Sequence, residues 1–259
     1  MKRSFMVDSL RVVVCDSREE MGCAAASDGA AFMRHVLAKT QEMSAIFAAA
    51  PSQNEVLDHL HREEGIDWSK VTAYHMDEYV GLAMDAPQRF ARYLDEHIFT
   101  KLPFKQICYM VDGNGKINPD YDDRFTHGHA DICYMGIGEN GHIAFNDPPV
   151  ADFFDTRYAK EVTLDLTCRM QQVHDGCFES LEKVPERAIT LTVPALLRSS
   201  KLICVVPGPT KAKAVYDTLT GPISTACPAS ILRIHPDATL YLDAQSASLL
   251  GNEHENSIL

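Results

Sequence analysis

The sequence predicts an α/β fold of the doubly wound, Rossmann-like kind, with a mostly parallel sheet and helices on both faces. Short runs rich in β-branched residues alternate with longer segments of helical periodicity through most of the chain. The runs are continuously apolar, as expected for strands that are covered on both faces. The length of 259 residues suits one large domain over residues 1–259 better than two small ones.

The elements follow one another in a regular order. Leu10–Cys15 is the first strand candidate, and an Ala- and Met-rich amphipathic segment over 18–40 predicts the helix that follows it. Residues 44–50 are interpreted as a second strand, with Ser52 as the cap of a helix that extends to about residue 62. Further strands are expected at 71–75, 107–110, 131–135, 188–192, 202–206 and 238–242, and further helices near 87–98, 194–199, 210–218 and 243–250.

The stretch from about 147 to 187 is the least regular part of the chain. It is polar, begins near two prolines and has no strong apolar period. We interpret it as an excursion from the sheet, a lid with one helix, rather than as a separate domain. The polar residues 251–259 are expected to form a frayed tail.

The charge balance limits the partners of the protein. The net charge is −12, whereas a nucleic-acid-binding protein needs a basic face, so no nucleic-acid partner is expected. No apolar stretch approaches the ~18 residues that span a membrane, and the first residues lack the apolar core of a secretory signal. The eight cysteines include no Cys-x-x-Cys pair and are expected to be reduced thiols. We therefore expect a cytoplasmic protein with no membrane partner, and a homo-oligomer stays open.

Four predicted strand ends lead into unusual polar loops. These loops are 49–54, 75–78, 136–142 and 207–211. In an open parallel sheet, ligands bind beyond the carboxyl ends of the strands, where loops lead into helices. The four loops therefore predict one pocket at one edge of the sheet.

The third of these loops is the strongest signal. Gly136, Gly138 and Gly141 permit positive φ angles and a close approach of a ligand to the main chain. His142 follows directly and can move protons near neutral pH, while Asp147 can orient its ring or share its proton. The alternative is a tight turn with an incidental histidine. The glycine spacing fits neither a P-loop nor a dinucleotide-binding motif.

Asp77 and Glu78 are adjacent carboxylates at the end of an apolar strand. Neighbouring side chains on a strand point to opposite faces, so we expect one to face the pocket as a base and the other to anchor the loop. An exposed acidic pair is the alternative. The segment Tyr79–Leu82 that follows is too apolar for an ordinary solvent-exposed turn.

Lys211 lies at a predicted helix start, where backbone N–H groups and the helix dipole favour a phosphate. Ser52, Gln53 and Asn54 could supply a second set of N–H donors, and a solvated lysine is the alternative for Lys211. The His-x-His pairs at 59–61 and 127–129 have no apparent third ligand, so no metal site is predicted.

Two segments resemble the signature segments of the glucosamine-6-phosphate deaminase (isomerase) family. They are His75-Met-Asp-Glu-Tyr-Val-Gly-Leu82 and Gly136-Ile-Gly-Glu-Asn-Gly-His-Ile-Ala-Phe-Asn-Asp-Pro148. Weaker similarity continues in the right order, so the resemblance covers most of the chain from about 44 to 243. It implies conversion of an amino-sugar 6-phosphate (glucosamine 6-phosphate or galactosamine 6-phosphate) and water into a ketohexose 6-phosphate and ammonia. It also implies that no metal or organic cofactor takes part.

The resemblance also implies roles for particular residues. Asp77 would be the base that moves a proton between C2 and C1. His142 would open the pyranose ring, with Asp147 as its carboxylate partner. Lys211 would hold the phosphate, aided by the 51–54 loop. The substrate site implied in this way further includes Glu78, Gly138 and Gly141.

The chain departs from the family pattern at several of these positions. Asn140 stands where many relatives have an aspartate that assists ring opening, and Asp147 stands where glutamate is usual. The segment 171–178 does not supply the arginine that many deaminases use for phosphate, and Arg169 or Arg233 would substitute for it. These changes indicate a divergent branch, with a different amino sugar or a changed reaction.

Two other readings remain open. The 6-phosphogluconolactonase family shares the fold and a Gly-x-Gly-x-x-Gly-His loop but lacks the segment at 76–82, and the continuation Ile143–Asn146 favours the deaminase family. The second alternative is a non-catalytic sugar-phosphate binding protein. The absence of a basic face disfavours a DNA-binding version of it.

Overall fold

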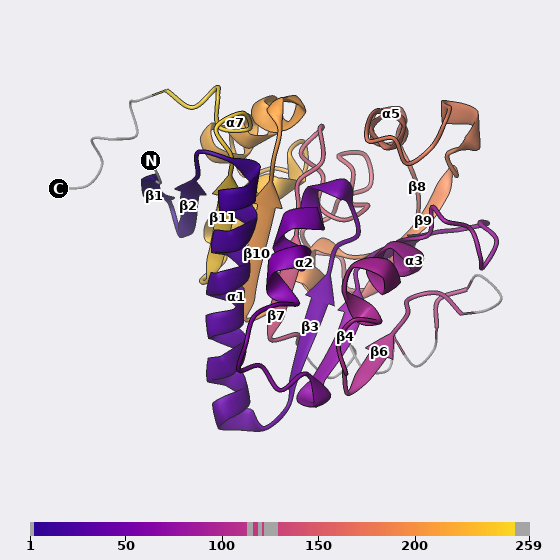
Figure 1. The fold of residues 1–259 in the computed structure, drawn as a ribbon. Helices are drawn as coiled ribbons and strands as arrows, with labels where there is room; N and C mark the ends of the chain where they lie inside the picture. The colour runs from indigo at the N-terminus through magenta and orange to yellow at the C-terminus, as the bar shows by residue number, and fades with distance from the viewer. Residues whose placement is uncertain (1–2, 113–115, 119–120, 122–128, 252–259) are drawn as a thin grey trace.

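A computed structural model of the protein describes residues 3–112, 116–118, 121 and 129–251. Its centre is an eight-stranded sheet in the order β1-β2-β11-β10-β7-β3-β4-β6, in which only the β1–β2 pair is antiparallel (Figure 1). The carboxyl ends of the parallel strands lie at the top of Figure 1. The strands are β1 (Arg3–Val7), β2 (Leu10–Val14), β3 (Met43–Phe47), β4 (Val71–His75), β6 (Gln106–Cys108), β7 (Ile132–Met135), β10 (Lys201–Val206) and β11 (Ala238–Leu242).

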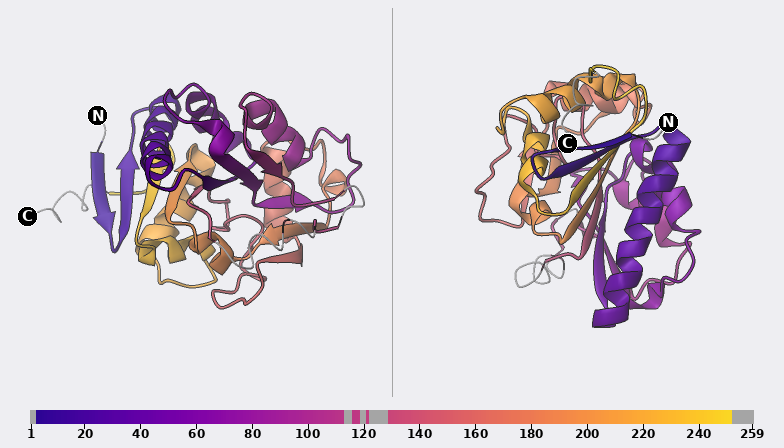
Figure 2. Two further views of the ribbon diagram at one scale, coloured as in Figure 1. Left: turned by 90° about the horizontal axis from the view of Figure 1, so that it is seen from below. Right: turned by 90° about the vertical axis from the view of Figure 1, so that its left-hand side faces the viewer.

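Helices cover both faces of this sheet, as the right-hand view of Figure 2 shows. One face packs against α1 (Arg18–Thr40), α2 (Asn54–Leu60) and α3 (Phe90–Leu94), and the other against α6 (Val193–Leu197) and α7 (Ala212–Thr220). The side chains of β7 alternate between the two cores, with Tyr134 in the first and Cys133 in the second. The predicted doubly wound sheet is confirmed.

Short helical turns complete the framework. The 3₁₀ turns are η1 (Pro51–Gln53), η2 (Trp68–Lys70), η4 (Leu181–Lys183), η5 (Pro209–Lys211) and η6 (Pro228–Ile234), and η3 (Asp95–Phe99) is a π-helical turn that continues α3. No helix in the described part of the chain is long and apolar enough to cross a membrane.

The helix α1 begins and ends where the sequence predicts. The Ser17 side chain accepts a hydrogen bond from the Glu20 N–H at 3.1 Å, which satisfies a donor at the helix start and stabilises it by about 1 kcal/mol. At the other end, Gln41 takes a left-handed conformation with φ 65° and closes the helix on Leu37. Arg18, the first residue of α1, is thereby fixed at the carboxyl edge of the sheet, shortly after the end of β2.

A second, three-stranded antiparallel sheet lies to one side, in the order β5-β9-β8. It consists of β5 (Asp77–Tyr79), β9 (Arg187–Leu191) and β8 (Ala159–Thr163), with β8 and β9 at the right of Figure 1. The chain leaves β4 at His75 and enters β5 after a single residue, Met76. The strand expected at 188–192 therefore exists but belongs to this sheet, which corrects its placement in the parallel sheet. Asp77 lies where the two sheets meet.

Three other expectations need correction. The excursion at 147–187 contains the strand β8 besides the predicted single helix, α5 (Leu166–His174). Residues 243–250 form turns instead of a helix: after the Asp243 carboxylate accepts the Ser246 N–H at 2.7 Å, the backbone bonds from Ser248 and Leu250 span only three residues and no α-helix continues. The tail from residue 252 lies outside the described residues.

The start of α2 also differs from the prediction. The helix begins at Asn54 after the turn η1, and its cap position is Gln53, without a side-chain capping bond. Ser52 lies inside η1, where its hydroxyl accepts a hydrogen bond from Gln53 Nε2 at 3.2 Å. Ser52 therefore faces the loop cluster at the sheet edge and does not cap the helix.

Candidate active site

A cavity of about 280 Å³ opens at the carboxyl edge of the adjacent strands β10, β7, β3 and β4. All four polar loops that the sequence singled out contribute to its wall, so their predicted convergence is confirmed. The helix α5 and the turn after it supply Gln171, Gln172 and Asp175 to the same cavity. The excursion at 147–187 thus covers part of the site.

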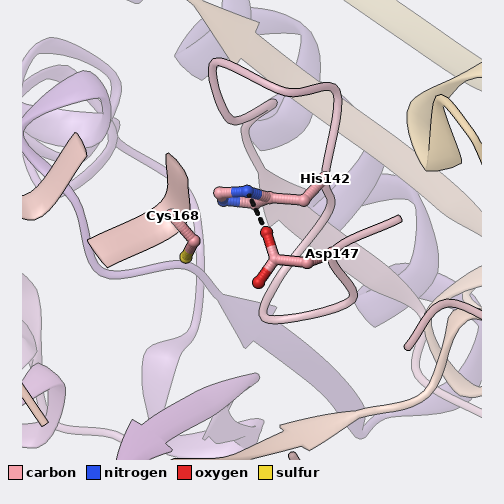
Figure 3. Close-up of side chains that lie close together, drawn as sticks. All are labelled: His142, Asp147 and Cys168. Carbon is pink, nitrogen blue, oxygen red and sulfur yellow. Dashed lines mark ion pairs between the residues drawn. The ribbon is translucent and has the colours of Figure 1, made fainter. Parts of the chain in front are cut away.

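His142 lies on the cavity wall and is 8% exposed. Its Nδ1 lies 2.9 Å from Asp147 Oδ1 (Figure 3) and 2.8 Å from Asn140 Oδ1. Asn140 Nδ2 donates to Asp147 Oδ1 at 2.9 Å, which fixes the amide so that its oxygen faces the ring. Both neighbours of Nδ1 are then acceptors, so Nδ1 carries the proton in the neutral ring and Nε2 keeps a lone pair.

Two glycines allow this arrangement. A Cβ atom at Gly138 would lie 2.1 Å from His142 Cε1, so only glycine leaves room for the ring. Gly141 has φ 82°, and a Cβ there would lie 2.6 Å from Cys227 Sγ. Gly138 also lines the cavity, whereas Gly141 shapes the turn from behind and is not part of the wall.

Asp147 is fully buried behind the His142 ring. Its side chain is shorter than the glutamate expected from the family pattern, yet its carboxylate reaches the ring. Burial pushes the pKa of Asp147 upward, but hydrogen bonds from His142, Asn140 and Cys168 outweigh it and hold the pKa below its ordinary value. Asp147 is therefore ionised beside the imidazole. Neither Asp147 nor Asn140 lines the cavity, so both act through His142.

Cys168 of α5 completes a buried group with His142 and Asp147 (Figure 3). One ligand atom from each lies within 4.8 Å of the others, and among the described residues this is the one group of three with metal-ligand chemistry. Burial and the neighbouring Asp147 raise the pKa of the Cys168 thiol well above its ordinary value, so the sulfur is protonated. Of the two His-x-His pairs, His59 binds Glu19 at 2.9 Å, and His127 lies outside the described residues.

Asp77 reaches the cavity from β5 and is 6% exposed. Burial, and secondarily the charge of Glu78, raises the pKa of Asp77 well above its ordinary value. The carboxyl group forms no hydrogen bond with the described residues and is open to a ligand. These are the properties of a group that can both take up and return a proton.

Glu78 points to the opposite side, as the alternation of a strand requires. It accepts the N–H groups of Phe90 and Ala91 at 3.1 Å each and forms an ion pair with Arg89 at 3.4 Å. It anchors the loop to the start of α3 while Asp77 faces the cavity, so the predicted opposite orientation of the two side chains is observed. Its assignment to the substrate site is corrected, because Glu78 is fully buried and does not line the cavity.

The cavity wall also carries groups suited to an anion. Lys211 lines the cavity and is only 5% exposed, and its ammonium group has no hydrogen bond or ion pair with any described residue. Burial lowers the pKa of Lys211, and the nearby Asp175 and Glu139 oppose this effect. Ser52 and Gln53 also line the cavity. Gln53 Nε2 donates to the Met135 carbonyl at 3.3 Å, which connects the loop after β3 to the end of β7.

Three residues assigned to the substrate site lie elsewhere. Asn54 accepts a hydrogen bond from the Tyr93 hydroxyl at 2.6 Å. Arg169 donates to the carbonyls of residues 181 and 184 at 2.9 and 3.0 Å, and Arg233 pairs with Asp8 at 2.6 Å. None of the three lines the cavity, and both arginines are held by local partners, so neither arginine replaces the missing phosphate ligand.

Four polar residues of the cavity wall carried no functional signal in the sequence: Arg18, Gln171, Gln172 and Asp175. Arg18 follows a helix cap and is one of many charged residues at the start of α1. The polar face of α5 carried no spacing that marked it as functional. Only the tertiary fold brings these residues to the edge of the sheet.

The fold and the site define an α/β protein with acid–base groups and a buried cation at the carboxyl edge of a parallel sheet. The family model of glucosamine-6-phosphate isomerases/6-phosphogluconolactonase matches residues 16–241, and the chain belongs to this family.

Two relatives and two solved structures illustrate the similarity. Glucosamine-6-phosphate deaminase of Exiguobacterium sibiricum is 37% identical over 74% of this chain and 75% of its own length, and that of Listeria welshimeri is 34% identical over 82% and 89%. A solved monomeric glucosamine-6-phosphate deaminase superposes with a TM-score of 0.81 at 28% identity, covering 92% of this chain and 99% of its own. A 6-phosphogluconolactonase of Trypanosoma brucei gives a TM-score of 0.73 over 93% and 98% of the chains, and at 15% identity it shares the fold alone.

Proposed function

We propose that this protein converts an amino-sugar 6-phosphate and water into a ketohexose 6-phosphate and ammonia. The observation that carries the proposal is the single cavity in which the His142–Asp147 pair, the buried Asp77 and the free Lys211 converge. The two relatives at 34% and 37% identity, both glucosamine-6-phosphate deaminases, support the same reaction.

Ring opening is the first step. His142 Nε2 takes the proton of the anomeric hydroxyl as the bond from C1 to the ring oxygen breaks, and the imidazolium returns a proton to that oxygen. Asp147 and Asn140 hold the Nδ1–H throughout, and the charge of Asp147 stabilises the imidazolium. The shorter side chain of Asp147 is no obstacle, since its carboxylate reaches the ring at 2.9 Å.

Proton transfer between carbons follows. Asp77 removes the C2 proton of the open-chain amino aldehyde, and the resulting enolamine is protonated at C1, which leaves an imine at C2. Water adds to C2 and ammonia leaves, so the ketose phosphate is formed with all atoms balanced. The raised pKa of Asp77 suits a group that must accept a proton and then release it.

A substrate panel tests the proposal. Purified protein is incubated separately with glucosamine 6-phosphate, galactosamine 6-phosphate and 6-phosphogluconolactone, and ammonia, ketose phosphate and acid release are measured. Ammonia together with ketose phosphate from either amino sugar supports the proposal and identifies the preferred C4 configuration. Lactone hydrolysis without ammonia would replace it with the lactonase reaction. Tight binding of the sugar phosphates without any turnover would show a non-catalytic binding protein.

A further inference from the structure

We propose that Arg18 is a phosphate-binding residue of this site and that it clamps the 6-phosphate together with Lys211. The inference rests on the proposed function, because it takes a sugar phosphate as the ligand. It assigns the second cation of the phosphate site to the start of α1, far in sequence from the segment 171–178.

Arg18 is placed to contact a ligand in the cavity. It lines the cavity with Ser52 and Lys211, and its side chain is 40% exposed. Its Nε donates to Glu55 Oε1 at 2.7 Å, and its Nη2 donates to the Pro51 carbonyl. A guanidinium group has five N–H donors, and Nη1 has no partner among the described residues. Arg18 is thus held in place on one side and has donors left for a ligand.

The charge balance of the cavity favours a second cation in addition to Lys211. Asp175 and Glu139 lie close enough to Lys211 to influence its pKa, so two carboxylates offset the one buried ammonium. A phosphate dianion needs more positive charge than Lys211 alone provides. Among the described residues that line the cavity, Arg18 and Lys211 are the only lysine or arginine side chains.

The other residues considered for the second cation of the phosphate site are excluded by their chemistry or by their contacts. The side chains that α5 and the turn after it direct to the cavity are two amides and one carboxylate, Gln171, Gln172 and Asp175. Arg169 and Arg233 are bound to carbonyl and carboxylate groups outside the cavity. The planar guanidinium of Arg18 also matches the geometry of phosphate oxygens better than a second ammonium would.

Calorimetric binding of glucitol 6-phosphate and of glucitol tests the inference without any turnover. The wild-type protein is expected to bind the phosphorylated polyol only. Arg18→Ala is expected to weaken this binding by about 10- to 100-fold, the loss typical of a charge-assisted hydrogen bond. Arg34→Ala is the matched control, because Arg34 also lies on α1 and pairs with an acid, Glu63 at 3.2 Å, but does not line the cavity. Its affinity should equal that of the wild type.

Two further measurements separate phosphate binding from support of the loop. Glu55→Gln leaves the charge of Arg18 intact and removes a competing carboxylate, so it should bind glucitol 6-phosphate at least as tightly as the wild type. Millimolar guanidinium ion should restore part of the affinity of Arg18→Ala. Unchanged affinity of Arg18→Ala would overturn the inference, as would an equal loss in Glu55→Gln without guanidinium rescue. Binding that depends on Arg18 in a protein that releases no ammonia would overturn the proposed reaction and leave the phosphate role of Arg18 intact.

Discussion

His142 Nδ1 and Asp147 Oδ1 lie 2.9 Å apart, and the Asn140 amide bridges the same two side chains. The amide both donates to the carboxylate and accepts from the ring, so the imidazole is oriented by one negative charge and one neutral group. Asn140 and Asp147, the two positions at which the sequence was expected to depart from the family pattern, therefore act together to orient the ring.

Asp77→Asn should abolish turnover while substrate binding is kept. The amide cannot accept the C2 proton, and loss of a general base typically lowers the rate by about 10²- to 10⁴-fold. The measurement is ammonia release at saturating substrate, with calorimetric binding of glucitol 6-phosphate as the second readout. Unchanged turnover at saturation with weakened binding would show that Asp77 is not the base.

The same substitution should stabilise the protein at neutral pH. Burial raises the pKa of Asp77 above its unfolded value, so the folded state holds this proton over a pH range in which the unfolded state has released it. Stability from this group is therefore complete below the unfolded pKa and decreases as the pH rises through the folded pKa. Asparagine has no such dependence and should gain about 1 kcal/mol or more at pH 7.5.

Denaturant unfolding of both proteins at pH 4.5 and pH 7.5 measures this difference. The free energy of unfolding of Asp77→Asn should exceed that of the wild type at pH 7.5 and approach it at pH 4.5. Substitution of the exposed Asp85 by asparagine is the control and should give the same small effect at both pH values. A wild-type protein that is the more stable of the pair at pH 7.5 would contradict a buried, unpaired Asp77.

Gly138→Ala should reduce turnover without a large loss of stability. The new Cβ would lie 2.1 Å from the His142 ring, so the ring must move away from its place in the cavity wall. We expect about a 10²-fold lower kcat, since misplacement of a reacting group by about 1 Å costs that much. Gly81→Ala should behave in the opposite way, because Gly81 has φ 93° and open space around it. It should lose about 1 kcal/mol of stability and keep its kcat. Equal kcat values for Gly138→Ala and the wild type would show that the position of the ring does not matter.

Cys168→Ala should lower kcat/KM by about two- to tenfold, because the Cys168 side chain helps to hold the pKa of Asp147 low. Cys168→Ser keeps a donor and should retain most of the activity. Cys204→Ala, at another buried cysteine in β10, is the control and should leave kcat/KM unchanged. Equal losses in the serine and alanine variants of Cys168 would indicate a packing role for the sulfur.

Chelation tests the expectation that no metal takes part. The group of His142, Asp147 and Cys168 has the residue types of a zinc site and offers three ligand atoms. Dialysis against EDTA should leave the rate of ammonia release unchanged. A loss of activity that Zn²⁺ restores would assign this group to a metal.

The sequence predicted the parallel sheet well because most of its strands are short apolar runs between clear helical segments. It could not place β9, since Ala188–Leu191 is buried and apolar in either sheet, and the pairing depends on the single-residue step at Met76. The strand β8 was missed because Ala159–Thr163 alternates buried and exposed residues without an apolar run. In each case long-range pairing decided the structure.

Some residues of the site were predictable from the sequence and others were not. Asp77 and Lys211 were predictable because Asp77 follows the buried strand β4 and Lys211 lies at the start of a helix at the sheet edge. His142 was predictable because it ends the glycine-rich loop after β7. Arg18 was not, because its role depends on the contact of α1 with the 51–53 turn and on the direction of one long side chain. The local anchoring of Arg169 and Arg233 was equally invisible, since carbonyl partners leave no signal in a sequence.

The most direct test of the central claim is the stoichiometry of a complete reaction. Glucosamine 6-phosphate and galactosamine 6-phosphate are each converted to completion, and ammonia and ketohexose 6-phosphate are quantified in the same sample. We expect equal amounts of the two products from at least one amino sugar with the wild type, and neither product with Asp77→Asn. Ketose phosphate or isomerised amino sugar without ammonia, or no product from either sugar, would contradict it.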